Sequence, residues 1–183
     1  AIVGTGVQAR YQARYISELM KVKKISIWGR DPKKAEKVKA DLSYLDVNIE
    51  SDIEKLVTES SLIVTTTSSK DPLIQSEWVK PGTHITAVGS DTPEKCELDP
   101  NLLSRADLLV ADSLEQNLIR GEIHQAAKQS LIDSENVVEL GEVFSGIKKG
   151  RVNQDSITIA DLTGVAVQDL VIAQAVFKAA KEA

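Results

Sequence analysis

A glycine-rich turn close to the amino terminus constrains the fold of this chain more than any other feature. The turn follows the apolar run Ala1–Val3 and precedes a helical stretch. Gly4 permits the tight turn, Gly6 lets the backbone approach phosphates, and Ala9 allows close packing of helix on strand. Backbone N–H groups at the start of the helix then face an anion. The pattern predicts a dinucleotide pyrophosphate site made by the consecutive residues Gly4, Thr5, Gly6, Val7, Gln8 and Ala9; the alternative is an ordinary strand-to-helix turn.

The composition is that of a single globular domain. The chain has 183 residues, of which 42% are hydrophobic and 27% are charged. Its net charge of −5 and the absence of a lysine- and arginine-rich run argue against a nucleic-acid partner. A single cysteine excludes an internal disulfide, and no apolar segment has the length of a membrane span. We therefore expect a cytoplasmic protein with no membrane partner.

The start of the chain is unusual for a fold of this kind. Only three residues precede the first glycine, whereas strands typically have about five or six residues. The chain also begins with alanine rather than methionine. These features lead us to expect that residues 1–183 are the later part of a longer polypeptide, with another domain before them.

Alternating apolar and polar periods predict an α/β fold. It is Rossmann-like and doubly wound, with a mostly parallel sheet and helices on both faces. Strands are expected at Ala1–Val3, Lys24–Trp28, Val47–Glu50, Leu62–Thr66, His84–Val88, Asp107–Ala111 and Ser156–Ala160. Helices are expected at Val7–Met20, at Lys33–Ser43 with Asp31 as N-cap, at Asp52–Glu59 with Ser51 as N-cap, and at Val165–Ala180, where a long apolar helix closes the chain.

Ligands of open parallel sheets bind beyond the carboxyl ends of the strands, so residues just after each strand are the informative ones. After the second strand, glycine occupies the place where NAD enzymes usually carry an acidic ribose ligand. Gly29 and Arg30, with Lys33 and Lys34 close behind, instead favour a 2′-phosphate, so NADP is preferred and NAD remains possible. The alternative is that Asp31 bends back to the ribose while Arg30 is a solvated surface charge.

Two further strand ends carry small or acidic side chains. The run that includes Thr66 and Thr67 leaves room for a cofactor across the strand end, although such runs are more often simple loops. The segment Val88–Asp91 places a carboxylate beside the expected nicotinamide, where Asp91 can exchange a proton while hydride moves. Asp91 can equally be an Asx-turn residue before Pro93.

Five spaced motifs in this chain resemble the ornithine cyclodeaminase and mu-crystallin family. They occur in order from end to end, at Gly4–Ala9, Val88–Pro100, Arg120–His124, Glu139–Val143 and Thr163–Asp169. The resemblance implies a Rossmann domain that binds NAD or NADP. It also implies an enzyme that oxidises an amino acid to an imine or reduces an imine to a cyclic amino acid.

The resemblance also implies roles for individual residues. Asp91 matches the family's proton donor or acceptor, and Lys95 matches a lysine beside the cofactor. By the same comparison, the nicotinamide is lined by Val88, Gly89 and Ser90, and from the far side by Thr163. Two residues depart from the family pattern: Glu94 replaces a usual glycine, and Leu162 replaces a serine that often contacts the cofactor.

The family also has an amino-terminal domain that binds the substrate carboxylate and forms most of a homodimer interface. With that domain outside this chain, the expected activity is NADPH-linked reduction of a cyclic imine, either a ketimine or pyrroline-2-carboxylate, to an amino acid. Ornithine cyclodeaminase or an amino-acid dehydrogenase is the alternative among enzymes. A non-catalytic protein that holds NADPH or a small ligand is the alternative of another class.

Other reactive residue types carry no chemistry of their own in this sequence. His84 and His124 are isolated from further ligands at metal spacing, so we expect structural roles and no metal. Cys96 lacks a histidine base and is expected to be an inert thiol. No serine sits in the strand-turn-helix elbow of a hydrolase.

Overall fold

One eight-stranded parallel sheet organises the protein, whose computed structural model describes residues 1–182. The strand order is β3-β2-β1-β4-β5-β8-β6-β7, and every paired strand is parallel. The strands are β1 (Ile2–Val3), β2 (Lys24–Trp28), β3 (Asp46–Ile49), β4 (Leu62–Thr65), β5 (His84–Ala87), β6 (Leu108–Ala111), β7 (Val138–Glu139) and β8 (Thr158–Asp161). The order reverses between β1 and β4, which is where Rossmann-type sheets bind their ligands.

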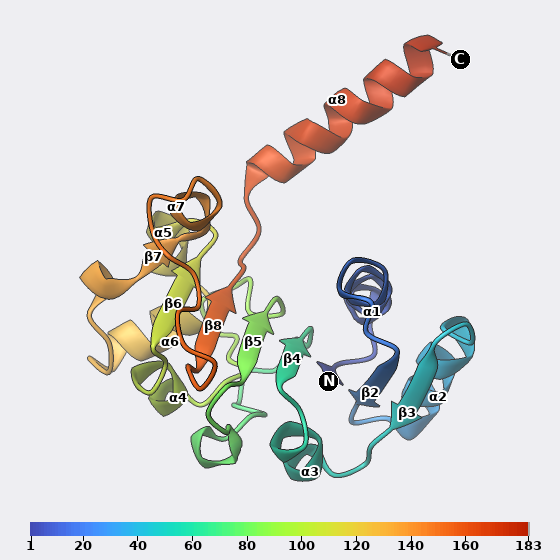
Figure 1. Cartoon of the computed structure of the whole chain (residues 1–183), viewed down its shortest axis with the longest axis horizontal. Coiled ribbons are helices and arrows are strands. Elements are labelled where there is room, and N and C mark those ends of the chain that lie inside the picture. Colours follow the sequence, from blue (N-terminus) through green and yellow to red (C-terminus); the bar gives the residue numbers. More distant parts are fainter. Residues whose placement is uncertain (183) are drawn as a thin grey trace.

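Helices connect the strands and complete the doubly wound architecture (Figure 1). They are α1 (Val7–Met20), α2 (Pro32–Asp41), α3 (Ile53–Thr58), α4 (Pro100–Ser104), α5 (Leu114–Asn117), α6 (Glu122–Lys128), α7 (Leu140–Phe144) and α8 (Ala166–Glu182), with 3₁₀ turns at Ser76–Trp78 and Ser134–Asn136. The predicted fold class is confirmed, and the described strand pairs are parallel throughout.

The core consists of two hydrophobic clusters on opposite faces of the sheet. Ile2 belongs to the cluster that contains residues of α1 and α2, whereas its neighbour Val3 belongs to the cluster that contains residues of α3, α4 and α6. Adjacent strand residues point to opposite faces, so these two side chains alone require helices on both sides of β1. Both are at most 1% exposed. A two-residue strand is thereby held firmly enough to carry the turn that follows it.

Several element boundaries differ from the sequence expectations. The Ser51 N-cap was wrong: α3 begins at Ile53, and the Asp52 carboxylate accepts hydrogen bonds from the backbone N–H groups of Glu54 and Lys55. The last strand lies at Thr158–Asp161, two residues later at its start than expected. Strand β7 and helices α4 to α7 were missed because runs of two to seven residues are too short to show a period.

Helix α8 leaves the body of the domain, as Figure 1 shows in red. It was expected at Val165–Ala180 and is found at Ala166–Glu182. None of its described residues is buried, and Leu170, Ile172 and Phe177 are each more than half exposed. Within residues 1–182, no helix combines the length and the apolar character that crossing a membrane requires.

Replacing Asp52 by alanine should lower the free energy of unfolding by about 1 kcal/mol, because two N–H groups at the start of α3 lose their acceptor. The matched control Ser51→Ala should change it by less than about 0.5 kcal/mol. Urea denaturation followed by circular dichroism measures both. Equal losses in the two variants would contradict the assignment of the cap to Asp52.

Candidate functional site

The glycine turn between β1 and α1 has the geometry of an anion site. Gly4 has φ of +129°, a conformation that favours glycine, and its N–H donates to the Trp28 carbonyl at 2.8 Å. A Cβ at Gly4 would overlap the Thr66 hydroxyl, whereas a Cβ at Gly6 would meet no atom within 4 Å. Gly6 is the N-cap of α1 and provides no side-chain cap, and the first turn of α1 has no acidic residue. The N–H groups at this helix start are therefore available to an external anion.

Arg10 holds this turn from within α1. Its Nη1 donates to the carbonyl oxygens of Thr5 and Gly6, both at 2.9 Å, and its Nε pairs with the Asp41 carboxylate at 2.7 Å. Two turn carbonyls are thus engaged by a cation, and α1 is tied to α2. Sequence analysis did not single out Arg10, because an arginine on a helix shows this role only when the turn folds back to it.

A cavity of about 440 Å³ extends from the glycine turn across the carboxyl ends of β1, β2, β4 and β5. Most of the predicted site residues line it: Gly4, Thr5, Gly6, Gln8, Gly29, Arg30, Thr66, Thr67, Val88, Gly89, Asp91 and Lys95. Six further residues line it: Asp31, the alternative ribose ligand, Lys34, expected near a 2′-phosphate, Ser68 and Ser69 of the hydroxyl run after β4, and Trp28 and Leu73, which were not anticipated. Four strand ends thus contribute to this cavity, together with residues of two of the five family motifs, Gly4–Ala9 and Val88–Pro100.

The other predicted site residues do not line this cavity. Val7 is 67% exposed on α1, and Ala9 is fully buried against the sheet, where it has the packing role expected of it. Lys33 does not line the cavity, whereas Lys34, the next residue of α2, does. Ser90 is buried and donates its hydroxyl to Glu122, and Thr163 donates its hydroxyl to Asp112 at 3.2 Å.

At the β2 end of the cavity, the chain presents a cation and a capping carboxylate. Arg30 is exposed and lines the cavity with Lys34. Asp31 Oδ1 accepts the Lys33 N–H at 2.9 Å and caps α2, so this oxygen is already engaged. A Cβ at Gly29 would overlap the Thr5 side chain, so this backbone leaves no space there for an acidic ribose ligand.

At the β5 end, Asp91 and Lys95 form an ion pair. The Lys95 Nζ lies 2.5 Å from Asp91 Oδ1, and the side chains of lysine and aspartate are 21% and 54% exposed. Within residues 1–182, no backbone N–H donates to the Asp91 carboxylate, as an Asx-turn would require. The carboxylate therefore faces the cavity with an ammonium group as its partner.

Behind this end of the cavity lie three buried carboxyl groups, those of Glu97, Glu122 and Asp161. Burial raises the pKa of Glu97, raises that of Glu122 to about 7, and raises that of Asp161 well above its usual value. Sequence analysis did not assign them, because a lone glutamate or aspartate reads as a surface residue. The available signal was that Glu97 and Glu122 fall inside two of the five family motifs.

The histidines and the cysteine have structural surroundings. The two ring nitrogens of His84 bond to the hydroxyls of Thr158 and Thr86, at 2.7 and 3.2 Å. Burial raises the pKa of the Cys96 thiol to about 12, so a reactive thiolate is disfavoured. In residues 1–182, no three or more His, Cys, Asp or Glu side chains are grouped so that they could hold a metal ion.

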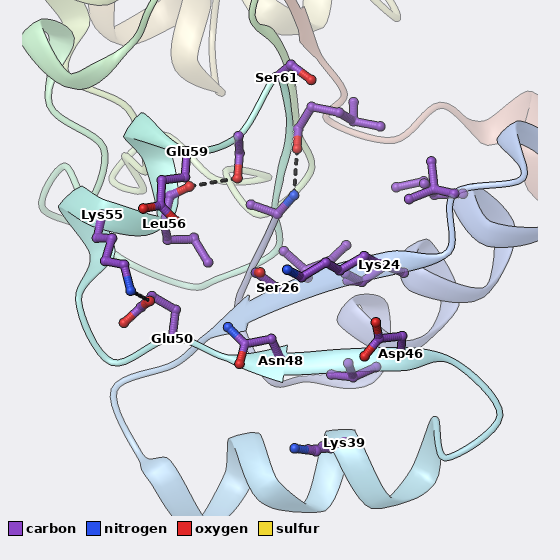
Figure 2. A pocket seen from close by; sticks show the side chains of 18 residues that line it. Lys24, Ser26, Lys39, Asp46, Asn48, Glu50, Lys55, Leu56, Glu59 and Ser61 are labelled. Carbon is purple, nitrogen blue, oxygen red and sulfur yellow. Dashed lines mark hydrogen bonds and ion pairs between the residues drawn. The ribbon is translucent and has the colours of Figure 1, made fainter.

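A larger cavity, of about 770 Å³, lies around the amino ends of β1, β2 and β4 (Figure 2). Figure 2 shows Lys55 facing Glu50 within it, and the two form an ion pair at 2.7 Å. Parallel sheets bind ligands at the opposite edge, where helix N–H groups and strand ends converge. We therefore assign the site to the smaller cavity at the carboxyl edge.

A family comparison agrees with this geometry. All of residues 1–183 match the model of the ornithine cyclodeaminase/mu-crystallin family. The chain belongs to this family. A relative named uncharacterized cyclodeaminase y4tK, from Sinorhizobium fredii, is 42% identical over 186 residues, covering 99% of this chain and 56% of the relative. The chain thus spans about half the length of the curated family members it matches, and the family expected from the motifs is confirmed.

Solved structures of the family superpose closely on this fold. An archaeal alanine dehydrogenase dimer with bound NAD has a TM-score of 0.93 and 34% identity, with 99% of this chain and 57% of that chain covered. The Δ1-pyrroline-2-carboxylate reductase of Thermococcus litoralis, in complex with NADH and L-proline, has a TM-score of 0.91 and 29% identity, with coverage of 99% and 57%.

A bulky side chain at Gly6 should abolish binding of a nicotinamide dinucleotide while leaving the fold intact. Gly6→Val adds atoms where the pyrophosphate would approach, yet its Cβ meets no protein atom within 4 Å. Titration calorimetry measures the binding, and thermal denaturation measures the fold. Gly141→Val is the control, because a Cβ at Gly141 is also unobstructed and that glycine is remote from the turn. Binding by Gly6→Val at the wild-type affinity would place the site elsewhere.

Proposed function

We propose that this chain is the cofactor-binding part of an NADP-dependent oxidoreductase that acts on C–N bonds. The proposed reaction is the reduction of a cyclic imine, either a ketimine or pyrroline-2-carboxylate, to an amino acid. The observation that carries the proposal is the Asp91–Lys95 pair in the same cavity as the glycine turn. The Thermococcus litoralis relative, a pyrroline-2-carboxylate reductase, supports the reaction class.

The residues of the cavity fit a nicotinamide dinucleotide. The N–H groups at the start of α1 have no side-chain cap, and Gly4 adopts a positive φ that favours glycine. Together these features suit the binding of a pyrophosphate. The cavity continues from there to Arg30 on one side and to Gly89 and Asp91 on the other. Two ends of different chemistry, one cationic and one carrying a proton-transfer group, match the adenosine and nicotinamide halves of such a cofactor.

We assign proton transfer to the Asp91 carboxyl group. The cavity residues would hold NADPH, which when bound would supply the hydride for the imine carbon. The Asp91 carboxyl donates a proton toward the imine nitrogen, which makes the carbon more electrophilic, and in the reverse direction it accepts that proton. The Lys95 ammonium, 2.5 Å from Asp91 Oδ1, orients the carboxylate within the cavity. Asp91, at the end of β5, is the proposed acid or base, and Lys95 contributes by orienting the Asp91 carboxylate.

Preference for NADP is proposed from the charges at the β2 end. Arg30 and Lys34 line the cavity there, and space for a carboxylate at position 29 is lacking. A guanidinium group binds a phosphate through two parallel N–H bonds, which suits a 2′-phosphate. The competing assignment is that Asp31, which also lines the cavity, binds the ribose of NAD.

Arg30→Ala should weaken NADPH by about 1–3 kcal/mol and NADH by much less, because only the former loses a charge-assisted hydrogen bond. Lys37→Ala is the control, since it removes one exposed charge of α2 that does not line the cavity. Dissociation constants come from titration calorimetry. Equal losses of both cofactors would exclude the phosphate contact, and selective loss of NADH in Asp31→Ala would favour the ribose assignment.

Asp91→Asn in the full-length protein should lower turnover about 10²–10⁴-fold, because the amide keeps the shape but has no titratable proton. Cofactor affinity should change little, because the change affects the reacting proton and not the cofactor contacts. The matched control is Asp46→Asn, at an exposed carboxylate of the amino edge. Near-normal turnover with an unchanged pH profile would make Asp91 a scaffold residue.

Within the family, a second enzyme activity and a second class of function remain to be tested. Ornithine cyclodeaminase, or an amino-acid dehydrogenase like the archaeal relative, would use the same hydride step in the oxidising direction. A non-catalytic NADPH-binding protein would bind the cofactor without turnover. Assaying cyclic ketimines, ornithine and alanine with the full-length protein distinguishes these possibilities.

The substrate carboxylate and the homodimer interface are proposed to involve residues outside this chain. The chain spans about half the length of its curated relatives, and the archaeal relative is a dimer. Of the groups lining the β5 end of the cavity, Lys95 is the only cation, and it is already paired with Asp91. A carboxylate of the substrate therefore needs further cations.

A further inference from the structure

The segment that carries Asp91 and Lys95 is held from behind by two buried carboxylates. It runs from the end of β5 to the start of α4, residues 88–99. Glu97 and Glu122, the two glutamates behind it, are both 0% exposed. Neither lines the cavity, so their contribution has to pass through the residues that they bind.

Glu97 joins the ends of β4 and β5 beyond the last ladder hydrogen bond, in which the Val88 N–H donates to the Thr65 carbonyl at 3.0 Å. Past that point, Oε1 accepts the Thr67 N–H at 2.5 Å, and Oε2 accepts the Gly89 N–H at 2.9 Å. The carboxylate thus replaces the missing ladder partners of two cavity-lining residues. A Cβ at Gly89 would overlap both Glu97 and the Thr67 carbonyl, so this close approach requires glycine.

Glu122 holds the same segment at two more points. Its Oε1 accepts hydrogen bonds from the Ser90 hydroxyl and, at 2.8 Å, from the N–H of Glu97 itself. Its Oε2 accepts the Leu98 N–H at 3.1 Å. Glu122 is the first residue of α6, and Asp161 fixes that helix start by accepting the Ile123 N–H at 2.8 Å. Ser90, directly before Asp91, is therefore tied to β8 through α6.

Carboxylates in these places have a geometric function that apolar residues or amides cannot fulfil. Each of the two glutamates accepts N–H donors on both of its oxygens, whereas an amide has only one acceptor oxygen. Burying such groups is costly, and burial raises the pKa of both. The arrangement costs stability and in return fixes the backbone of Thr67, Gly89 and Ser90.

We infer that Glu97 and Glu122 are positioning residues, which hold Gly89 and Asp91 in the conformation that binds the nicotinamide half of the cofactor. The inference rests on the proposed function, because it takes the cavity to be a dinucleotide site. By this inference, different residues hold the two halves of the cavity in shape. The adenosine and pyrophosphate half depends on the turn at Gly4 and Gly6, and the nicotinamide half depends on the buried carboxylates.

The test compares two ligands that differ only in the nicotinamide. Titration calorimetry on the full-length protein measures dissociation constants for NADPH and for ADP-ribose 2′-phosphate, with NADH and ADP-ribose as a parallel pair. Glu97→Gln should weaken the complete dinucleotides about tenfold, since one N–H group is left facing an amide N–H₂. The ligands that lack nicotinamide should change by less than about twofold, because their contacts lie at the glycine turn. Glu122→Gln should show the same selectivity.

Asp107→Asn is the matched control for the buried glutamates. Its carboxylate also accepts a backbone N–H, that of Ile157 at 2.8 Å, but at the amino edge of the sheet. It should lower thermal stability without changing either affinity. If Glu97→Gln fails to fold, Ser90→Ala removes a single hydrogen bond to Glu122 and should show the same selectivity at about threefold.

Equal weakening of both ligands by the glutamate variants would overturn the inference, as would no weakening of either. Each result would reduce the two glutamates to general structural residues while leaving dinucleotide binding by the wild-type protein in place. Failure of the proposed function looks different, because the wild-type protein would then bind neither NADPH nor NADH. That result would overturn the inference as well.

Discussion

Parallel strands that separate at the edge of a sheet leave backbone N–H groups without ladder partners, and the site depends on how those groups are satisfied. At the start of α1 they stay open, because Gly6 offers no side-chain cap and the first turn has no acidic residue. At the ends of β4 and β5 the N–H groups are instead satisfied within the protein, because the Glu97 carboxylate accepts hydrogen bonds from the N–H groups of Thr67 and Gly89. One edge thereby contains an anion cradle and a rigid, already satisfied loop.

The carboxylates of the protein divide into two kinds according to their partners. Asp91 is half exposed and pairs with the Lys95 ammonium at the cavity, which makes it the carboxylate that we propose as the proton-transfer group. Glu97 and Glu122 are fully buried and accept backbone N–H groups, so their oxygens are engaged by the chain itself. The exposed and the buried carboxylates are thus neighbouring but separate residues, and Ser90, which precedes Asp91 and donates to Glu122, links them.

Much of the fold and of the cavity lining was predictable because glycine turns and strand ends leave local signals. The turn at Gly4 and Gly6 and the strand ends at Gly29, Thr66 and Gly89 all line one cavity, as parallel topology requires. Short elements such as β7 were missed because two residues show no period. The N-cap of α3 was assigned one residue too early, since Ser51 and Asp52 both suit that position and only the backbone angles choose between them.

The sequence by itself determined the parallel α/β class, the glycine turn between β1 and α1, and the family, because these follow from local patterns and from the order of the motifs. Only the tertiary structure decided the hydrogen-bond partners of Arg10, Glu97 and Glu122. These partners lie elsewhere in the fold: across a turn for Arg10, and between 8 and 32 residues away along the chain for the two glutamates. An acidic side chain is buried and bonded to backbone N–H groups only when the packing of the sheet and helices removes it from water and brings those groups to it.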